Sequence, residues 1–192
     1  VLAFFGKMDE VVLKGDGIPY PGTPDWGAFA PKSHVGQLPV LQDGDVTIGQ
    51  SGAILRYLVK KLGICEDITL ADYAVSEQCI EQAADIHSLL SKAQYSPDRT
   101  AAMDEVFADG SRLHKILAAF EAIATDSGFF GSKPTPGDLA FAASLNLIHR
   151  LEEGALAKYP KLSALHTAAT ANEGVAAVNK STPYPYFKRK SD

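Results

Sequence analysis

The sequence predicts an α/β segment followed by an all-helical one. The first observation is a strand–turn–strand–helix pattern over residues 36–58. The second is a helical spacing of apolar residues, which resumes beyond this helix and continues through most of the remaining chain. The third is an S/T-x-x-D capping arrangement at residues 135–138, directly before an apolar helix. We therefore expect two domains, over residues 1–63 and 70–192, joined by a short linker.

Composition restricts the class of protein. The chain has 192 residues, of which 46% are apolar and 21% charged, as in an ordinary soluble globular protein. Its net charge of −5 argues against a nucleic-acid partner. No apolar run approaches the roughly 20 residues of a membrane span. Cys65 and Cys79 stand apart without a C-x-x-C pair, and the 5 His residues show no ligand spacing. We therefore expect two free thiols in a reducing, cytoplasmic compartment and no bound metal.

A β-hairpin is predicted where two apolar runs flank residues 42–45. The Asp43-Gly44 pair in this turn supplies the residue type that positive φ angles require. Pro39 lies inside the first run, where a proline would remove one N–H group from a central strand. A cis peptide at Leu38–Pro39 would explain this position, because it turns backbone groups outward at the end of a strand. The alternative is an ordinary trans proline on an edge strand.

A helix is predicted to follow the hairpin. Ser51 occupies the expected N-cap position, and apolar residues at helical spacing follow it. Free N–H groups and the helix dipole at such a terminus favour a carboxylate, so Gln50-Ser51 is a candidate anion-binding site. The alternative is that Ser51 only caps the helix.

The helical part is predicted from apolar periodicity in three segments. These segments cover residues 70–92, 104–125 and 136–148. Thr135 is expected to cap the third segment, with Pro136 in the first helical position. Asp138 is expected to reach back to the Thr135 N–H group and complete a capping box. This third segment is largely uncharged, which predicts a buried central helix.

Two sequence blocks resemble the glutathione-binding half of the glutathione S-transferase family. Residues 36–41 match its G-x-x-P-x-L strand start, and residues 50–58 match its Gln/Glu-Ser pair followed by a helix. The resemblance is to cytosolic, sigma-like members, and it implies a thioredoxin-like N-terminal domain followed by a helical bundle. Residues 159–178 resemble the family's last helices. Residues 1–14 resemble the end of the family's first helix and its second strand. The first strand and most of the first helix are then expected to be missing; the alternative is a short N-terminus.

The resemblance also implies a set of glutathione-binding residues. They are Trp26, Lys32, Gln37, Leu38, Pro39, Gln50, Ser51 and Asp85. Trp26 keeps the family's interval of eleven residues to Gln37. Ala30 stands where the family often has a lysine, and Lys32 is the nearest replacement. Two alternatives stay open: a lid over the core for Trp26, and a solvated helix face for Asp85.

The function implied by the resemblance is conjugation of the glutathione thiol to small electrophiles, by a homodimer or a pair of related chains. Glutathione is the ligand implied, without a metal. The family's thiolate-stabilising Tyr, Ser or Cys has no counterpart in residues 1–13, so the catalytic residue is unknown. The chain as written is expected to bind glutathione weakly and to show little transferase activity. An alternative is a non-catalytic structural or interaction subunit of a larger assembly. A disulfide oxidoreductase is disfavoured, because no Cys lies at a suitable strand-to-helix turn.

Overall fold

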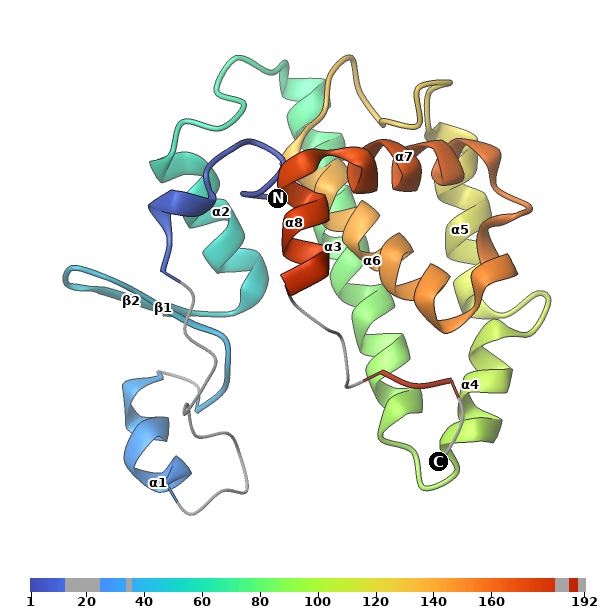
Figure 1. Ribbon diagram of the computed structural model, residues 1–192, viewed down its shortest axis with the longest axis horizontal. Coiled ribbons are helices and arrows are strands. Elements are labelled where there is room, and N and C mark those ends of the chain that lie inside the picture. Colours follow the sequence, from blue (N-terminus) through green and yellow to red (C-terminus); the bar gives the residue numbers. More distant parts are fainter. Residues whose placement is uncertain (13–24, 34–35, 182–186, 190–192) are drawn as a thin grey trace. The chain divides into compact units, whose positions relative to one another are not determined.

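The computed structural model describes residues 1–12, 25–33, 36–181 and 187–189 (Figure 1). The chain divides into two compact units. The first, which we call the α/β unit, is Lys7–Glu66. The second, which we call the helical unit, combines Val1–Gly6 with Asp67–Asp192.

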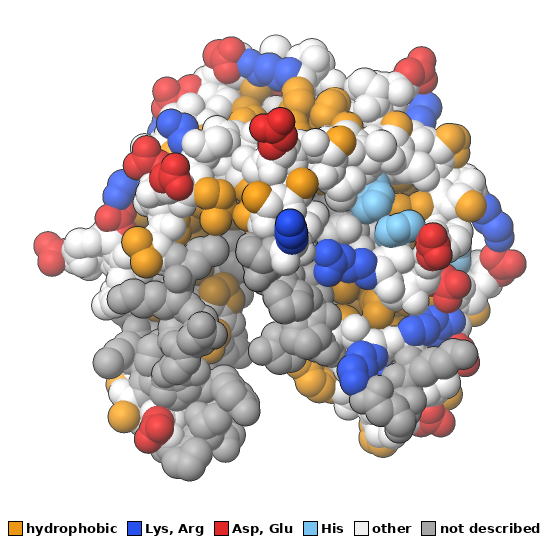
Figure 2. Space-filling model, in the orientation of Figure 1, with side chains coloured by type: hydrophobic (Ala, Val, Ile, Leu, Met, Phe, Trp, Pro, Cys, Tyr) orange, Lys and Arg blue, Asp and Glu red, His pale blue; other side chains and the backbone are white. Residues whose placement is uncertain are grey.

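Charges of both signs cover the surface. The chain has 23 acidic and 18 basic residues. Figure 2 shows acidic and basic side chains interspersed on the visible face. This mixture is typical of the surface of a globular protein, where charged side chains of both signs remain hydrated.

The α/β unit contains an antiparallel hairpin and short helical segments (Figure 1). In chain order they are η1 Met8–Glu10, α1 Trp26–Phe29, η2 Ala30–Lys32, β1 Val40–Asp43, β2 Val46–Gly49 and α2 Ser51–Lys61. The register pairs Val40 with Gly49 and Asp43 with Val46. Gly44 in the turn has a φ of +57°, a conformation that glycine adopts without steric cost. The predicted hairpin and its Asp-Gly turn are therefore confirmed.

The first residues of the chain fold with the helical unit. Val1, Phe4 and Phe5 pack against its core. The resemblance predicted the end of a helix and then a strand over residues 1–14, but residues 1–12 form turns and the short η1 segment. A strand needs a paired neighbour, and within the described residues β1 and β2 pair only with each other. The predicted strand is therefore wrong for the part of it that is described.

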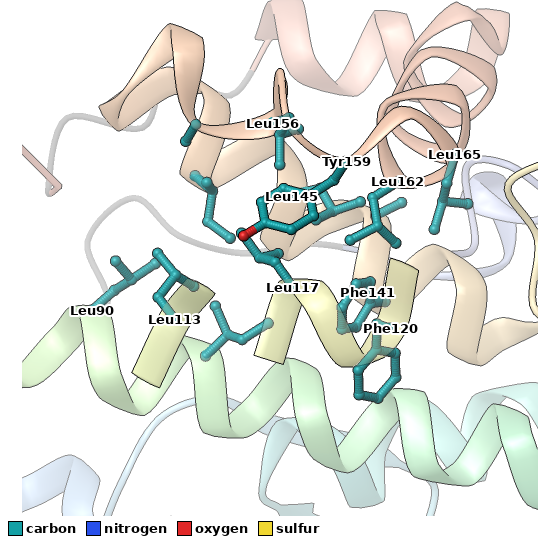
Figure 3. Packing of buried hydrophobic residues seen from close by; sticks show 14 of the residues in the cluster. Leu90, Leu113, Leu117, Phe120, Phe141, Leu145, Leu156, Tyr159, Leu162 and Leu165 are labelled. Carbon is teal, nitrogen blue, oxygen red and sulfur yellow. The ribbon is translucent and has the colours of Figure 1, made fainter. Parts of the chain in front are cut away.

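The helical unit is built around two long helices that pack side by side, α3 and α6 (Figure 1). Its elements are α3 Leu70–Gln94, α4 Arg99–Phe107, α5 Arg112–Ile123, α6 Pro136–Leu151, η3 Glu153–Leu156, α7 Pro160–Ala171 and α8 Glu173–Ser181. Their apolar faces meet in one core, drawn in Figure 3. The rings of Phe120 and Phe141 stack there with centroids 4.5 Å apart, and Phe130 stands edge-on to both. The core therefore links α5 and α6 through specific aromatic packing as well as through burial.

One predicted helix is two helices in the structure. Periodicity predicted a single helix over residues 104–125, but α4 ends at Phe107 and α5 begins at Arg112. Between them Gly110 has a φ of +74°, and the Ser111 side chain accepts a hydrogen bond from the His114 N–H group and so caps α5. The apolar spacing is almost unbroken across this corner, so periodicity alone did not reveal it.

The start of α6 confirms the predicted capping box. Thr135 Oγ1 accepts from the Asp138 N–H group at 3.3 Å, and Asp138 Oδ2 accepts from the Thr135 N–H group at 2.8 Å. Pro136 has no N–H group to satisfy, and the Gly137 N–H group donates to Ser76 Oγ of α3 at 2.9 Å. Each N–H group in the first turn of this buried helix terminus therefore has a partner or is absent.

Candidate functional site

The segment before β1 presents its backbone at the end of the hairpin. The Leu38–Pro39 peptide bond is cis, which confirms the prediction. Gln37, Leu38 and Pro39 are exposed, and 41% of the Leu38 surface remains accessible. Pairing between β1 and β2 begins only at Val40, so the strand ladder does not include these three residues. The main-chain groups of Leu38 can therefore face a ligand rather than a neighbouring strand.

The hairpin register brings a second segment to the same end. Val40 and Gly49 form the pair farthest from the turn. Pro39, just before Val40, and Gln50, just after Gly49, therefore lie at the same end of the hairpin. Gln50 is the N-cap of α2, and Ser51 is its first residue. The prediction that Ser51 is itself the N-cap is wrong by one position. The reason is conformational, because the chain makes its turn into the helix at Gln50, with φ of +70° and ψ of 114°.

The backbone at Gln50 is strained. A side chain other than glycine in this region costs about 1–3 kcal/mol, and such residues cluster where the surroundings impose a functional geometry. The Gln50 side chain makes no capping hydrogen bond to the helix. It is exposed at the same end of the hairpin as Pro39. The strain therefore fixes the direction in which the chain enters α2, at a position suited to ligand binding.

The N-terminus of α2 can hold an anion. The helix ladder begins with the Ile54 N–H group, which donates to the Gln50 carbonyl at 2.9 Å. The N–H groups of the first turn, before Ile54, donate to no carbonyl within the helix, and they form the positive end of the helix dipole. Ser51 is exposed and adds a hydroxyl donor there. A carboxylate bound at this point would receive charge-assisted hydrogen bonds from both kinds of group.

Trp26 and Lys32 lie earlier in the same unit. Trp26 is the first residue of α1 and is half-buried. Lys32 is the last residue of η2, and its side chain lies outside what the structure describes. Both residues therefore belong to the unit that carries the hairpin, and a role for either in ligand binding stays a prediction.

Asp85 lies on α3, in the helical unit. Its carboxylate is exposed, and Oδ2 accepts from Arg112 Nη2 of α5 at 3.2 Å. An exposed ion pair of this kind stabilises a protein only slightly. The structure therefore places Asp85 on a solvated helix face, which is one of the two interpretations given above. A contact of Asp85 with a ligand of a partner chain stays a prediction.

Sequence reasoning missed the group that ties α2 to the hairpin. Tyr57 Oη donates to Asp43 Oδ2 at 2.6 Å, and Lys61 forms an ion pair with the same oxygen. Lys61 and then Tyr57 lower the pKa of Asp43 through these hydrogen bonds. The pairing therefore stabilises the fold above the unfolded-state pKa of about 4 and is lost as pH falls through the lower folded-state value. The four-residue spacing of Tyr57 and Lys61 was the available signal, since such residues share a helix face.

Two other kinds of site were sought in the part of the chain that the structure describes. No group of three or more His, Cys, Asp or Glu side chains gathers there in a way that would hold a metal ion. None of the described helices combines the length and apolar character that crossing a membrane requires.

Comparison with known proteins identifies the family. Residues 84–182 match the family model for the glutathione S-transferase C-terminal domain, and residues 21–60 match the model for the N-terminal domain. Glutathione S-transferase 2 of Onchocerca volvulus is 30% identical over 147 residues, which cover 74% of this chain and 69% of the relative. Hematopoietic prostaglandin D synthase of Mus musculus is 29% identical over 160 residues, which cover 80% of this chain and 76% of the relative.

A solved structure agrees with the sequence comparison. The pi-class glutathione S-transferase of Onchocerca volvulus superposes with a TM-score of 0.77 at 25% identity, over 94% of this chain and 84% of that one. The predicted fold class is therefore confirmed as a thioredoxin-like N-terminal domain followed by a helical one. Matches to both domain models together cover most of the chain. The chain belongs to the glutathione S-transferase family.

Proposed function

We propose that this protein binds glutathione at the end of the hairpin and conjugates its thiol to small electrophiles. The observation that carries the proposal is the placement of an exposed serine at a helix N-terminus beside the backbone of Leu38 and Pro39. A tripeptide with a free carboxylate needs both features. The helix N-terminus binds its carboxylate, and the exposed backbone binds its main chain. Family membership supports the same ligand.

Each part of the proposed site has a distinct task. Ser51 and the N–H groups of the first turn of α2 receive the carboxylate of the γ-glutamyl residue. The main chain at Leu38 pairs with the peptide of glutathione, as an added strand pairs with a sheet edge. Gln37 and Gln50 offer amide groups beside it. Trp26 and Lys32 are assigned to the glycine end, and Asp85 to the glutathione of a partner chain.

The chemical step requires the thiolate. A free thiol with a pKa of about 8.5 is mostly protonated at neutral pH, so the enzyme must favour the anion with a hydrogen-bond donor. The thiolate sulfur then attacks the electrophilic carbon. A carbon–sulfur bond forms, the leaving group departs with the electron pair, and the thiol proton passes to solvent. Conjugation of a generic aryl halide tests this step in two proteins: the chain as written, which is expected to show little activity, and a version that also carries the family's segment with the Tyr, Ser or Cys. If the second version binds glutathione without conjugating it, the non-catalytic subunit is favoured.

Replacing Ser51 with alanine should weaken glutathione binding about tenfold or more. Hydrogen bonds to charged groups contribute roughly 1.5–3 kcal/mol, and about 1.4 kcal/mol corresponds to a factor of ten in affinity. Titration calorimetry with glutathione measures the change directly. Ser51→Thr keeps the hydroxyl and should stay close to the parent.

A matched control separates binding from folding. Ser111 is also a helix-terminal serine, but it caps α5 in the helical unit. Ser111→Ala should lower stability and leave the glutathione affinity unchanged. Equal affinities in the parent and in Ser51→Ala would remove Ser51 from the site.

We also propose that the protein forms a homodimer, in which the first domain of one chain, residues 1–63, meets the second domain of the other, residues 70–192. Tyr57 and Arg56 of α2 are the candidate contacts on the first domain, and the Tyr57 hydroxyl also donates to Asp43. Light scattering at micromolar concentration should give twice the chain mass of 20.5 kDa. A mass of one chain in dilute solution would refute the dimer for the isolated protein.

A reducing, cytoplasmic location completes the proposal. Neither Cys65 nor Cys79 forms a disulfide. Cys79 is fully buried, and this burial raises its pKa, which makes it inert at neutral pH. Disulfides are rare in reducing compartments, and two cysteines outside any disulfide fit such a setting.

A further inference from the structure

Ser33 holds the backbone of Gln37 at both of its polar groups. The Ser33 hydroxyl donates to the Gln37 carbonyl oxygen at 2.8 Å. The Ser33 hydroxyl oxygen also accepts from the Gln37 N–H group at 3.1 Å. One side chain therefore satisfies the donor and the acceptor of the residue that leads into the proposed glutathione-binding edge.

Ser33 is itself fixed. It keeps only 4% of its surface accessible, an unusual degree of burial for a serine in a connecting segment. Its N–H group donates to the Ala30 carbonyl at 3.0 Å, and its carbonyl accepts from the Gly36 N–H group at 3.0 Å. These two bonds fix the backbone of Ser33, and its burial restricts the side chain. The Ser33 hydroxyl therefore has a fixed position from which it can bind Gln37.

The segment that Ser33 anchors has little other support from the sheet. The β1–β2 ladder starts at Val40, three residues after Gln37. Gly36 has a φ of +60°, so the chain reverses direction immediately before Gln37. Without the Ser33 hydroxyl, both polar groups of Gln37 would turn to water, and the direction of the Leu38 main chain would no longer be set.

We propose that Ser33 is a positioning residue for glutathione recognition: by holding both polar groups of Gln37, it sets the direction of the Leu38 main chain, which meets the peptide of the ligand. This inference rests on the proposed function. It assigns a role to a side chain that need not touch the ligand, and it divides the site into two supports. Ser51 and the α2 terminus hold the charge of the ligand, and Ser33 holds the edge that binds its main chain.

The test compares the parent chain with Ser33→Ala and Ser33→Thr. Loss of two neutral hydrogen bonds should weaken glutathione binding about five- to tenfold in Ser33→Ala, measured by calorimetry well below the unfolding temperature. Ser33→Thr keeps the hydroxyl and should restore the affinity to within about threefold of the parent. A role in folding alone would shift the unfolding temperature of both variants and leave the affinity of the folded protein unchanged.

Hydrogen exchange of the Gln37 amide supplies a second readout. In the parent this amide should exchange slowly, because its N–H group is bonded to a buried oxygen, and exchange should become fast in Ser33→Ala. If the alanine variant does not fold, exchange of the Gln37 amide is measured in the parent alone. Fast exchange in the parent would overturn the inference.

The possible failures are distinguishable. A parent that does not bind glutathione contradicts the proposed function itself. A parent that binds, together with Ser33→Ala of equal affinity, contradicts only the role of Ser33. Weak binding by Ser33→Thr that matches Ser33→Ala would also contradict it, because the hydroxyl would then not be the group that matters.

Discussion

Replacing Asp138 with alanine should lower the free energy of unfolding by about 3–5 kcal/mol. The carboxylate is fully buried and accepts three hydrogen bonds. Phe130 N–H donates at 2.7 Å, Thr135 N–H at 2.8 Å and Thr135 Oγ1 at 2.5 Å. Alanine would leave two main-chain N–H groups buried without partners, each at about 1–3 kcal/mol, and it would remove the capping box of α6.

Burial and hydrogen bonding act in opposite directions on the carboxyl group of Asp138. Burial raises the pKa of this carboxyl group, and the hydrogen bonds from Thr135 and Phe130 act in the opposite direction. The network therefore depends on each of its donors, because a buried carboxyl group without them is strongly penalised.

Urea denaturation, followed by the helical circular dichroism signal, measures the loss. Thr135→Ala should cost about 1 kcal/mol, as the loss of an N-cap usually does. A second T-x-x-D pair provides a control, because the Thr69 hydroxyl donates to Asp72 and accepts from the Asp72 N–H group at the exposed start of α3. Asp72→Ala should have a much smaller effect. Similar losses at the two aspartates would show that burial is not what makes Asp138 important.

Replacing Gly137 with alanine should destabilise the protein by about 3 kcal/mol, although alanine favours helices over glycine by about 1 kcal/mol. An added Cβ would lie 2.1 Å from the Ser76 carbonyl oxygen and 2.5 Å from the Ser76 Cα atom. These are backbone atoms of α3 and cannot rotate away, so the two helices would have to separate. Overpacking of this kind typically costs 1–3 kcal/mol, and here it would also stretch the bond from Gly137 N–H to Ser76 Oγ.

The control for this prediction is Gly154→Ala. A Cβ at Gly154, in η3, would meet no atom within 4 Å, so the substitution should change stability by less than about 0.5 kcal/mol. The denaturation midpoints of both variants decide the question. If Gly137→Ala were more stable than the parent, helix propensity would outweigh the close packing of α3 on α6, and the packing would be looser than described.

Local patterns in the sequence were sufficient for several elements. The Asp43-Gly44 turn, the cis bond at Leu38–Pro39 and the Thr135 capping box each depend on residues within a few positions of one another. Such features can be predicted because backbone sterics and short-range hydrogen bonds act at fixed intervals along the chain. The apolar spacing of α3 and α6 was equally clear, since a 3.6-residue period extends over many turns.

Where local signals competed, the sequence was misleading. Ser51 is a good N-cap residue, yet the chain enters α2 through a strained Gln50. The corner between α4 and α5 carries a glycine and a capping serine inside an almost continuous apolar pattern. In both places the conformation of one or two residues decided the boundary, and periodicity does not report φ and ψ.

By itself, the sequence determined the α/β and helical parts of this protein, its hairpin and the start of its central helix. Only the tertiary structure decided that Gly137 contacts Ser76, 61 residues away in the chain. The reason is physical. Periodic patterns reflect forces that act between near neighbours, whereas the contacts of a buried polar group depend on how whole elements pack, and packing brings together residues that no interval in the sequence connects.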